Sequence, residues 1–125
     1  MRALSIKQPW LYCITDLDKR VENRTWKPPD WIIGQRIALH SSKKMGDLVA
    51  ASDIAGFKLS TVANDMPLGA IVATARVDGW IDFLDSKWFS GPVGWILSDV
   101  VKLHEPVPHR GRLGLWEVSV ELAIQ

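Results

Sequence analysis

Short segments of alternating or continuous apolar residues recur along the chain, and this pattern predicts strands rather than long helices. Such strands are predicted at residues 2–6, 36–40, 69–77, 95–103 and 113–122. The run 19–26 is rich in charge and contains β-branched residues, so it fits a further strand or an extended loop. The GxxG sequences at 91–94 and 111–114 are predicted to be turns.

Two segments have helical character. Residues 9–17 form the first, because Pro9 suits the opening turn of a helix, where no backbone N–H is needed. The second covers about residues 43–56, with Ser41 and Ser42 as candidate caps. Its apolar stripe is formed by Met45, Leu48, Val49 and Ile54.

These elements predict an α+β fold that is mainly β. Strands occur at both ends of the chain and are separated by irregular turns, which argues against a doubly wound parallel sheet. A small, mostly antiparallel β-barrel with two or three flanking helices fits better. Residues 1–125 are expected to form a single domain, since a chain of this length buries a sizeable core without covalent staples.

Composition narrows the class of protein. The chain is 47% hydrophobic and 23% charged, as in ordinary globular proteins. Cys13 is the single cysteine, which excludes an intramolecular disulfide and a zinc framework. No signal-peptide pattern and no apolar run of about 20 residues is present. We therefore expect a cytoplasmic protein with no membrane partner, and a monomer is favoured.

Charge is unevenly distributed along the chain. Residues 1–44 contain nine Lys or Arg and four acidic residues, a net charge of +5, although the whole chain is only +1. The asymmetry is compatible with one basic face that attracts a polyanion, and equally with a solvated surface of balanced pairs. The small total charge favours a short strand, a nucleotide or a nucleoside over long nucleic acid.

The strong sequence motifs of nucleotide and metal enzymes do not occur. There is no P-loop, no dinucleotide fingerprint, no H-E-x-x-H and no C-x-x-C pair. His40, His104 and His109 do not have the spacing of metal ligands. We therefore expect no cofactor and no metal.

Tryptophan and one charged run are the unusual features that remain. The seven tryptophans exceed ordinary usage, and most of them are expected in the core, although Trp10 and Trp26 lie beside polar residues. If residues 19–26 are extended, Arg20, Glu22 and Arg24 share one face. They then form either a surface ion-pair ladder of little energetic value or a carboxylate held between cations inside a cleft.

The order of several sequence blocks resembles the ASCH domain family of the PUA-like superfamily. The matching blocks are LSIKQPW (4–10), KRVENRTW (19–26), IALHSS (37–42), PLGAIV (67–72), GPVGW (91–95) and GRLGLW (111–116). The first two are the most specific. The resemblance implies a small β-barrel with a cleft between barrel and helix, and that cleft is associated with RNA, nucleotides or modified nucleosides.

By this resemblance, the segment Gln8-Pro9-Trp10 lies at the cleft. Trp10 offers a flat face on which a base can stack. Gln8 can donate and accept hydrogen bonds at a base edge, and Pro9 leaves the helix N-terminus facing the ligand. Trp26 and Ser41, which lie in the matching blocks, complete this part of the predicted ligand-binding set.

The same resemblance places Lys19, Glu22 and Arg24 next to that segment. A glutamate carboxylate only accepts hydrogen bonds, so Glu22 would select an exocyclic amine, as on cytosine or adenine. Lys19 and Arg24 would hold a carbonyl, a phosphate or a reaction intermediate. The expected partner is single-stranded RNA, a nucleoside or a nucleotide.

An enzymatic alternative also follows from the resemblance. One family branch removes the acyl group from N4-acetylcytidine, and its catalytic lysine and an arginine match Lys19 and Arg24. That branch carries a threonine where this chain has Glu22, and Thr25 lies on the other side of the alternation. Lys19 and Glu22 are the candidate catalytic pair, with Glu22 as base; other family members act as ribonucleases or RNA binders. A protein–protein module with exposed tryptophans is the third alternative.

Overall fold

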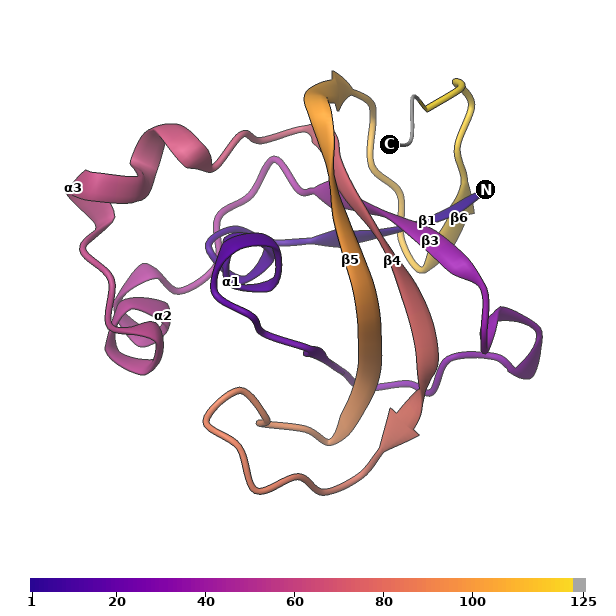
Figure 1. Cartoon of the computed structure of the whole chain (residues 1–125), viewed down its shortest axis with the longest axis horizontal. Helices are drawn as coiled ribbons and strands as arrows, with labels where there is room; N and C mark the ends of the chain where they lie inside the picture. Colours follow the sequence, from indigo (N-terminus) through magenta and orange to yellow (C-terminus); the bar gives the residue numbers. More distant parts are fainter. Residues whose placement is uncertain (123–125) are drawn as a thin grey trace.

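The computed structural model describes residues 1–122 and shows a mixed α+β fold built around one six-stranded sheet (Figure 1). The strands are β1 (Arg2–Ile6), β2 (Val21–Arg24), β3 (Arg36–Ser41), β4 (Ala70–Ile81), β5 (Val93–Pro108) and β6 (Leu115–Glu117). The helices are α1 (Trp10–Asp16), α2 (Leu48–Ala55) and α3 (Leu59–Val62), with single 3₁₀ turns at Asp30–Ile32 and Ala63–Asp65. The sheet curls into a half-barrel, which confirms the predicted mainly β class.

Strand order in the sheet is β2-β5-β4-β3-β1-β6. The β1–β3 pair is parallel and the other four pairs are antiparallel, in agreement with the prediction of a mostly antiparallel sheet. The long β4–β5 hairpin changes register at three places, and β3–β4 changes register between Leu39 and His40. Irregularities of this kind bend strands and increase their twist, so they contribute to the curl of the sheet.

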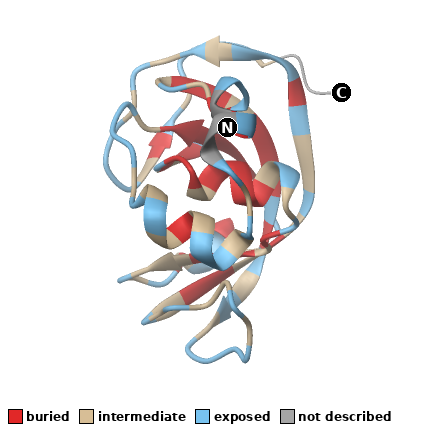
Figure 2. Ribbon diagram, turned by 90° about the vertical axis from the view of Figure 1, so that its left-hand side faces the viewer, coloured by how far each residue is buried: buried red, intermediate tan, exposed pale blue. Residues whose placement is uncertain are grey.

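The core lies between the sheet and α1, and Figure 2 shows buried residues concentrated in the strands and in the helix packed on them. Helix α1 buries four consecutive residues, Leu11 to Ile14. Leu11 and Ile14 pack against apolar side chains from β1, β3, β4 and β5, of which the bulkiest is Trp95, with no exposed surface. Tyr12 packs instead in a smaller cluster with Val62 and Met66. This packing fixes the start of α1 against the ends of β1 and β2, where the pocket opens.

Helix α2 differs from the prediction at its start and on its surface. It begins at Leu48, and its cap is Asp47, whose carboxylate accepts from the backbone N–H of Ala50 at 3.0 Å. Ser41 belongs to β3 instead, and its hydroxyl is used elsewhere. The expected apolar stripe is not a core face, since Val49 is 70% exposed.

The tryptophans are less buried than the sequence suggests. Trp95 and Trp116 are the two buried ones, whereas Trp31 is 56% exposed. The prediction that most of the seven fill the core is therefore wrong. The half-barrel has one apolar face of limited area, and aliphatic side chains already occupy most of it. In the part of the chain described, no helix has the length and hydropathy needed to span a membrane.

Candidate functional site

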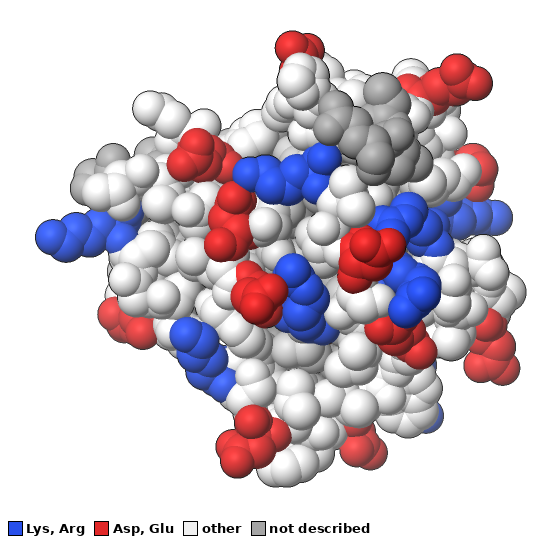
Figure 3. All heavy atoms as spheres, in the orientation of Figure 1, with Lys and Arg blue, Asp and Glu red and all other residues white. Residues whose placement is uncertain are grey.

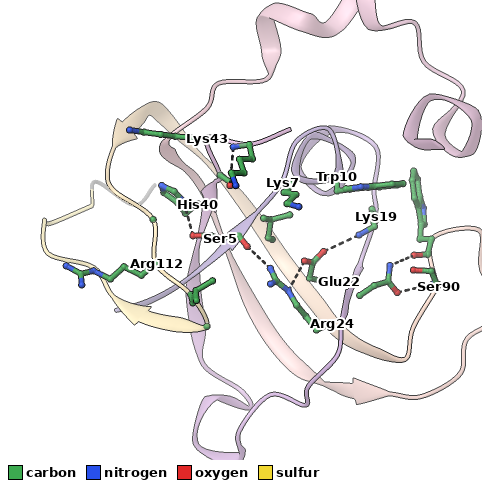
Figure 4. A pocket seen from close by; sticks show the side chains of 18 of the residues that line it. Ser5, Lys7, Trp10, Lys19, Glu22, Arg24, His40, Lys43, Ser90 and Arg112 are labelled. Carbon is green, nitrogen blue, oxygen red and sulfur yellow. Dashed lines mark hydrogen bonds and ion pairs between the residues drawn. The ribbon is translucent and has the colours of Figure 1, made fainter. Parts of the chain in front are cut away.

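A pocket of about 950 Å³ opens beside the start of α1. Its walls come from the end of β1, the segment that leads into β2, the residues after β3, helix α2, the β4–β5 loop and the loop at residues 110–114. The volume lies at the upper end of the range of small-ligand sites. Figure 4 shows the side chains that line it.

Glu22 lies in the pocket wall between two cations (Figure 4). Lys19 Nζ lies 3.4 Å from Glu22 Oε1, and Arg24 Nε donates to Glu22 Oε2 at 3.1 Å. Lys19 and Glu22 are only 2% and 6% exposed. Alternation along β2 puts Glu22 and Arg24 on the same face, and Lys19 approaches from the residues before the strand. The Glu22 carboxylate is therefore held between two cationic side chains, one on each of its oxygens.

Arg20 is not the second cation of this cluster, contrary to the prediction from strand alternation. It precedes β2, and its guanidinium donates to the backbone carbonyls of Ile14 and Lys19 and pairs with Asp18. Strand alternation applies only from Val21 onward, which is why Arg20 leaves the face that Glu22 shares. Lys19 takes the position expected for Arg20.

Trp10 and Trp88 supply the aromatic part of the pocket wall. The Trp10 ring is half-buried, and Lys19 Nζ lies 5.8 Å from its centroid. Trp88 belongs to the β4–β5 loop, which Asn23 holds in place. The Asn23 amide donates to the Trp88 carbonyl at 2.9 Å and accepts from the N–H groups of Ser90 and Gly91. Sequence reasoning missed Asn23 and Trp88, whose partners lie more than 60 residues away along the chain.

Gln8 and Ser41 do not line the pocket. The Gln8 side chain accepts from the Tyr12 N–H at 2.8 Å and donates to the Pro67 carbonyl at 3.4 Å. The Ser41 hydroxyl donates to the same carbonyl at 2.5 Å. Their hydrogen-bonding groups therefore join α1 and β3 to the segment before β4. The predicted ligand contact of these two side chains has no support in this arrangement.

Trp26 and Pro9 are also absent from the pocket wall. The Trp26 ring packs edge-on against Trp95, with centroids 4.8 Å apart, and its carbonyl accepts from the Trp95 indole at 2.9 Å. Pro9 is buried just before α1, and its carbonyl accepts from the Cys13 N–H. Of the eight predicted site residues, Trp10, Lys19, Glu22 and Arg24 line it.

The pocket wall is strongly basic. It contains eight Lys or Arg and one acidic residue, Glu22, a net charge of +7 on a chain of +1. Five of the eight come from the basic N-terminal third: Lys7, Lys19, Arg24, Lys43 and Lys44. By contrast, the face in Figure 3 carries acidic and basic side chains interspersed. The excess of basic residues in the N-terminal third of the sequence therefore lies largely around this pocket.

His40 and Ser5 form a hydrogen-bonded pair in the same wall. His40 Nε2 lies 2.7 Å from the His109 carbonyl, which can only accept, so this nitrogen carries the proton. The Ser5 hydroxyl then donates to His40 Nδ1 at 3.0 Å. Burial lowers the pKa of His40, which favours the neutral ring. Sequence reasoning weighed His40 only as a metal ligand, and the described residues contain no cluster suited to a metal ion.

No protein-family model matches the chain, and no curated protein matches it either.

Proposed function

We propose that the protein is an ASCH-like module that binds RNA or a nucleoside or nucleotide, with one base held in the pocket. The observation that carries this proposal is the Glu22 carboxylate, which lies almost buried in the pocket wall between Lys19 and Arg24. The Lys19 ammonium in turn lies 5.8 Å from the centre of the Trp10 ring. A pocket of about 950 Å³ is large enough for a nucleotide.

The four predicted residues that line the pocket can each contact a different part of a base. The Trp10 ring stacks on its face, an interaction worth about 1–3 kcal/mol. The Glu22 carboxylate accepts from an exocyclic amine, which selects cytosine or adenine over uracil. Lys19 and Arg24 hold the Glu22 carboxylate in place and supply donors for a neighbouring carbonyl. Because both cations are already bonded to Glu22, the acceptor is preorganised before the ligand arrives.

Hydrolysis is the second candidate function, and the close Lys19–Glu22 contact favours it. In this scheme Glu22 takes a proton from water, the resulting hydroxide attacks the acyl carbon of an N4-acylcytidine, and Lys19 stabilises the oxyanion. The carbon–nitrogen bond then breaks, the amine recovers the proton from Glu22, and a carboxylic acid and cytidine leave. The same pair would serve a ribonuclease. Both Glu22 oxygens are bonded to cations, however, and this suits an acceptor better than a base.

Glu22→Gln separates the two functions. The amide oxygen still accepts a hydrogen bond, so a binding protein should lose about 1–2 kcal/mol of affinity for cytidine or adenosine. A hydrolase should lose turnover on N4-acetylcytidine by roughly 10²–10⁴, because the amide cannot carry a proton. Lys19→Met should likewise lower turnover more than affinity. Calorimetric titration and product release measured on the same nucleosides distinguish these results.

The matched control is Glu105→Gln, which removes an exposed carboxylate outside the pocket wall. Each variant is first checked by circular dichroism at the assay temperature, so that loss of binding is not loss of folding. If the unmodified protein binds neither nucleosides, nucleotides nor short RNA, the binding proposal is wrong. If the unmodified protein shows no turnover on acylated cytidine or on RNA, the proposed hydrolase function is wrong.

A further inference from the structure

The pocket has two chemically different ends, and Figure 4 separates them. One end, which we call the aromatic end, contains Trp10 and the Lys19–Glu22 pair. Trp88 belongs to this end because Asn23, next to Glu22 in β2, is hydrogen-bonded to its carbonyl. The other, the cationic end, lies beside His40 and contains Lys43 and Arg112. Arg110 belongs to this end because it follows His109, whose carbonyl is hydrogen-bonded to His40. Binding of a base explains the residues of the aromatic end, but it does not explain the cluster of cations at the other end.

The cationic end has no acidic partners. Among residues 1–122, no carboxylate lies within ion-pair distance of Lys43, Arg110 or Arg112, and the same holds for Lys7 and Lys44. Like charges gathered in a concave site with low-dielectric walls repel one another, and their field attracts an anion. Arg36, Arg76 and Lys102 elsewhere on the surface are each paired with an aspartate.

The loop that carries the two arginines is held by buried groups. His40 Nε2 donates to the carbonyl of His109, the residue before Arg110, and His40 Nδ1 accepts from Ser5. Gly111 packs directly on this pair: a Cβ at this position would lie 2.7 Å from His40 Cε1. Only glycine allows that approach, so the positions of Arg110 and Arg112 are set by the fold before any ligand binds.

A chain of hydrogen bonds connects the two ends. Arg24 Nε bonds to Glu22, and its Nη2 donates to the Ser5 carbonyl at 2.6 Å. The Ser5 hydroxyl bonds in turn to His40, which holds the arginine loop. Since one continuous network positions the base acceptor and the cationic loop, the structure fixes the spacing between them, as a ligand that reaches both ends requires.

We propose that the cationic end is a phosphate subsite, occupied by a phosphate ester on the same nucleoside whose base lies at the aromatic end. The inference rests on the proposed base-binding function and narrows its ligand to a nucleotide or an RNA strand. Arginine suits this role because its planar guanidinium binds two phosphate oxygens at once. A free nucleoside would leave the unpaired cations without a counter-charge.

The test compares ligands with and without phosphate. Dissociation constants are measured by calorimetry for cytidine, cytidine 5′-monophosphate and a cytidine tetranucleotide, with the adenosine series alongside. We expect the dissociation constant of the monophosphate to be at least about tenfold lower than that of the nucleoside. This difference corresponds to the free energy of one charge-assisted hydrogen bond. A tetranucleotide that binds much more tightly than the monophosphate identifies an RNA strand as ligand; equal affinities identify the mononucleotide.

The matched variants are Arg110→Gln/Arg112→Gln and the control Lys27→Gln/Lys58→Gln, which removes two exposed charges away from the pocket wall. The arginine variant should lose the tenfold advantage of the monophosphate and keep its affinity for cytidine. The control should retain both affinities. Both arginines are exposed, so the variants are expected to fold, and circular dichroism checks this.

Salt dependence is a second readout of the same subsite. Each neutralised phosphate of a single strand contributes a slope of about −0.7 to log K against log salt, so two phosphates weaken binding about sevenfold between 50 and 200 mM. Equal affinity for cytidine and its monophosphate, or a phosphate advantage that survives in the arginine variant, overturns the subsite and leaves base binding intact. Failure of every nucleoside, nucleotide and tetranucleotide to bind would mean that the proposed binding function itself is wrong.

Discussion

The buried pair of Lys19 and Glu22 gives the sharpest energetic prediction. Their charged atoms lie 3.4 Å apart and their side chains are 2% and 8% exposed, so both groups have lost most of their hydration. With an effective dielectric constant near 20, the attraction is about 5 kcal/mol before that desolvation is subtracted. Glu22→Gln leaves the Lys19 ammonium buried without a carboxylate. Breaking a buried pair in this way costs about 3–5 kcal/mol of unfolding free energy.

Lys19→Met should cost less than Glu22→Gln, because the carboxylate keeps Arg24 as its second partner. The double variant should lose about 2 kcal/mol less unfolding free energy than the two single variants lose together, since neither charge remains buried alone. Urea denaturation of all four proteins at one pH measures this coupling. The exposed pair of Glu117 and Arg2 is the control, and Glu117→Gln should cost less than about 1 kcal/mol.

Two results would refute this reasoning. A loss of less than about 1 kcal/mol in Glu22→Gln would mean that Lys19 is hydrated or held by other groups. Additivity of the two single variants within about 0.5 kcal/mol would mean that the two charges do not interact energetically. Either result would also weaken the proposal that Glu22 is a preorganised acceptor in the pocket.

Three further predictions follow from close contacts and burial. Gly94→Ala should cost about 1–3 kcal/mol by overpacking, because the new Cβ would lie 2.6 Å from Val21 Cγ2; an unchanged melting temperature contradicts this. Burial lowers the pKa of His40, so the unfolded chain binds more protons as the pH falls below about 6.5. The contribution of His40 is therefore complete above that pH and is lost on acidification, and His40→Gln should flatten this part of the stability profile; an equal slope contradicts it. The Cys13 thiol has no exposed surface and burial raises its pKa, so a thiol reagent should modify it only after unfolding, and rapid labelling of the native protein would contradict this.

Local patterns in the sequence predicted the central sheet and the shared face of Glu22 and Arg24, and the family resemblance added Lys19 and Trp10 to the predicted site. Strands β1, β3 and β4 carry apolar runs or alternation strong enough to be located from the sequence. The convergence of Glu22 and Arg24 followed from the two-residue period of a strand, and Lys19 lies close enough along the chain to join them. Short-range geometry determines these features, so a single sequence contains the information.

Features set by distant partners could not be predicted in the same way. The pattern 113–122 alternates throughout, yet β6 covers only Leu115–Glu117. Its neighbour β1 begins at Arg2, whose partner is Glu117, so later residues have no strand to pair with. The bond from His40 to the His109 carbonyl joins groups 69 residues apart. No local pattern reveals such contacts, and the cationic end of the pocket depends on them.

The position of β1 inside the sheet has a consequence for the order of folding. Ala3 pairs with Ala38 on one side and with Trp116 on the other. During synthesis Ala38 emerges soon after Ala3, whereas Trp116 emerges much later. Until then one edge of β1 stays open, and an open edge can pair with another chain. The nascent protein therefore depends on β6 to cover this edge of β1 against aggregation. Closure of the long loop between β1 and β6 is expected to limit the folding rate.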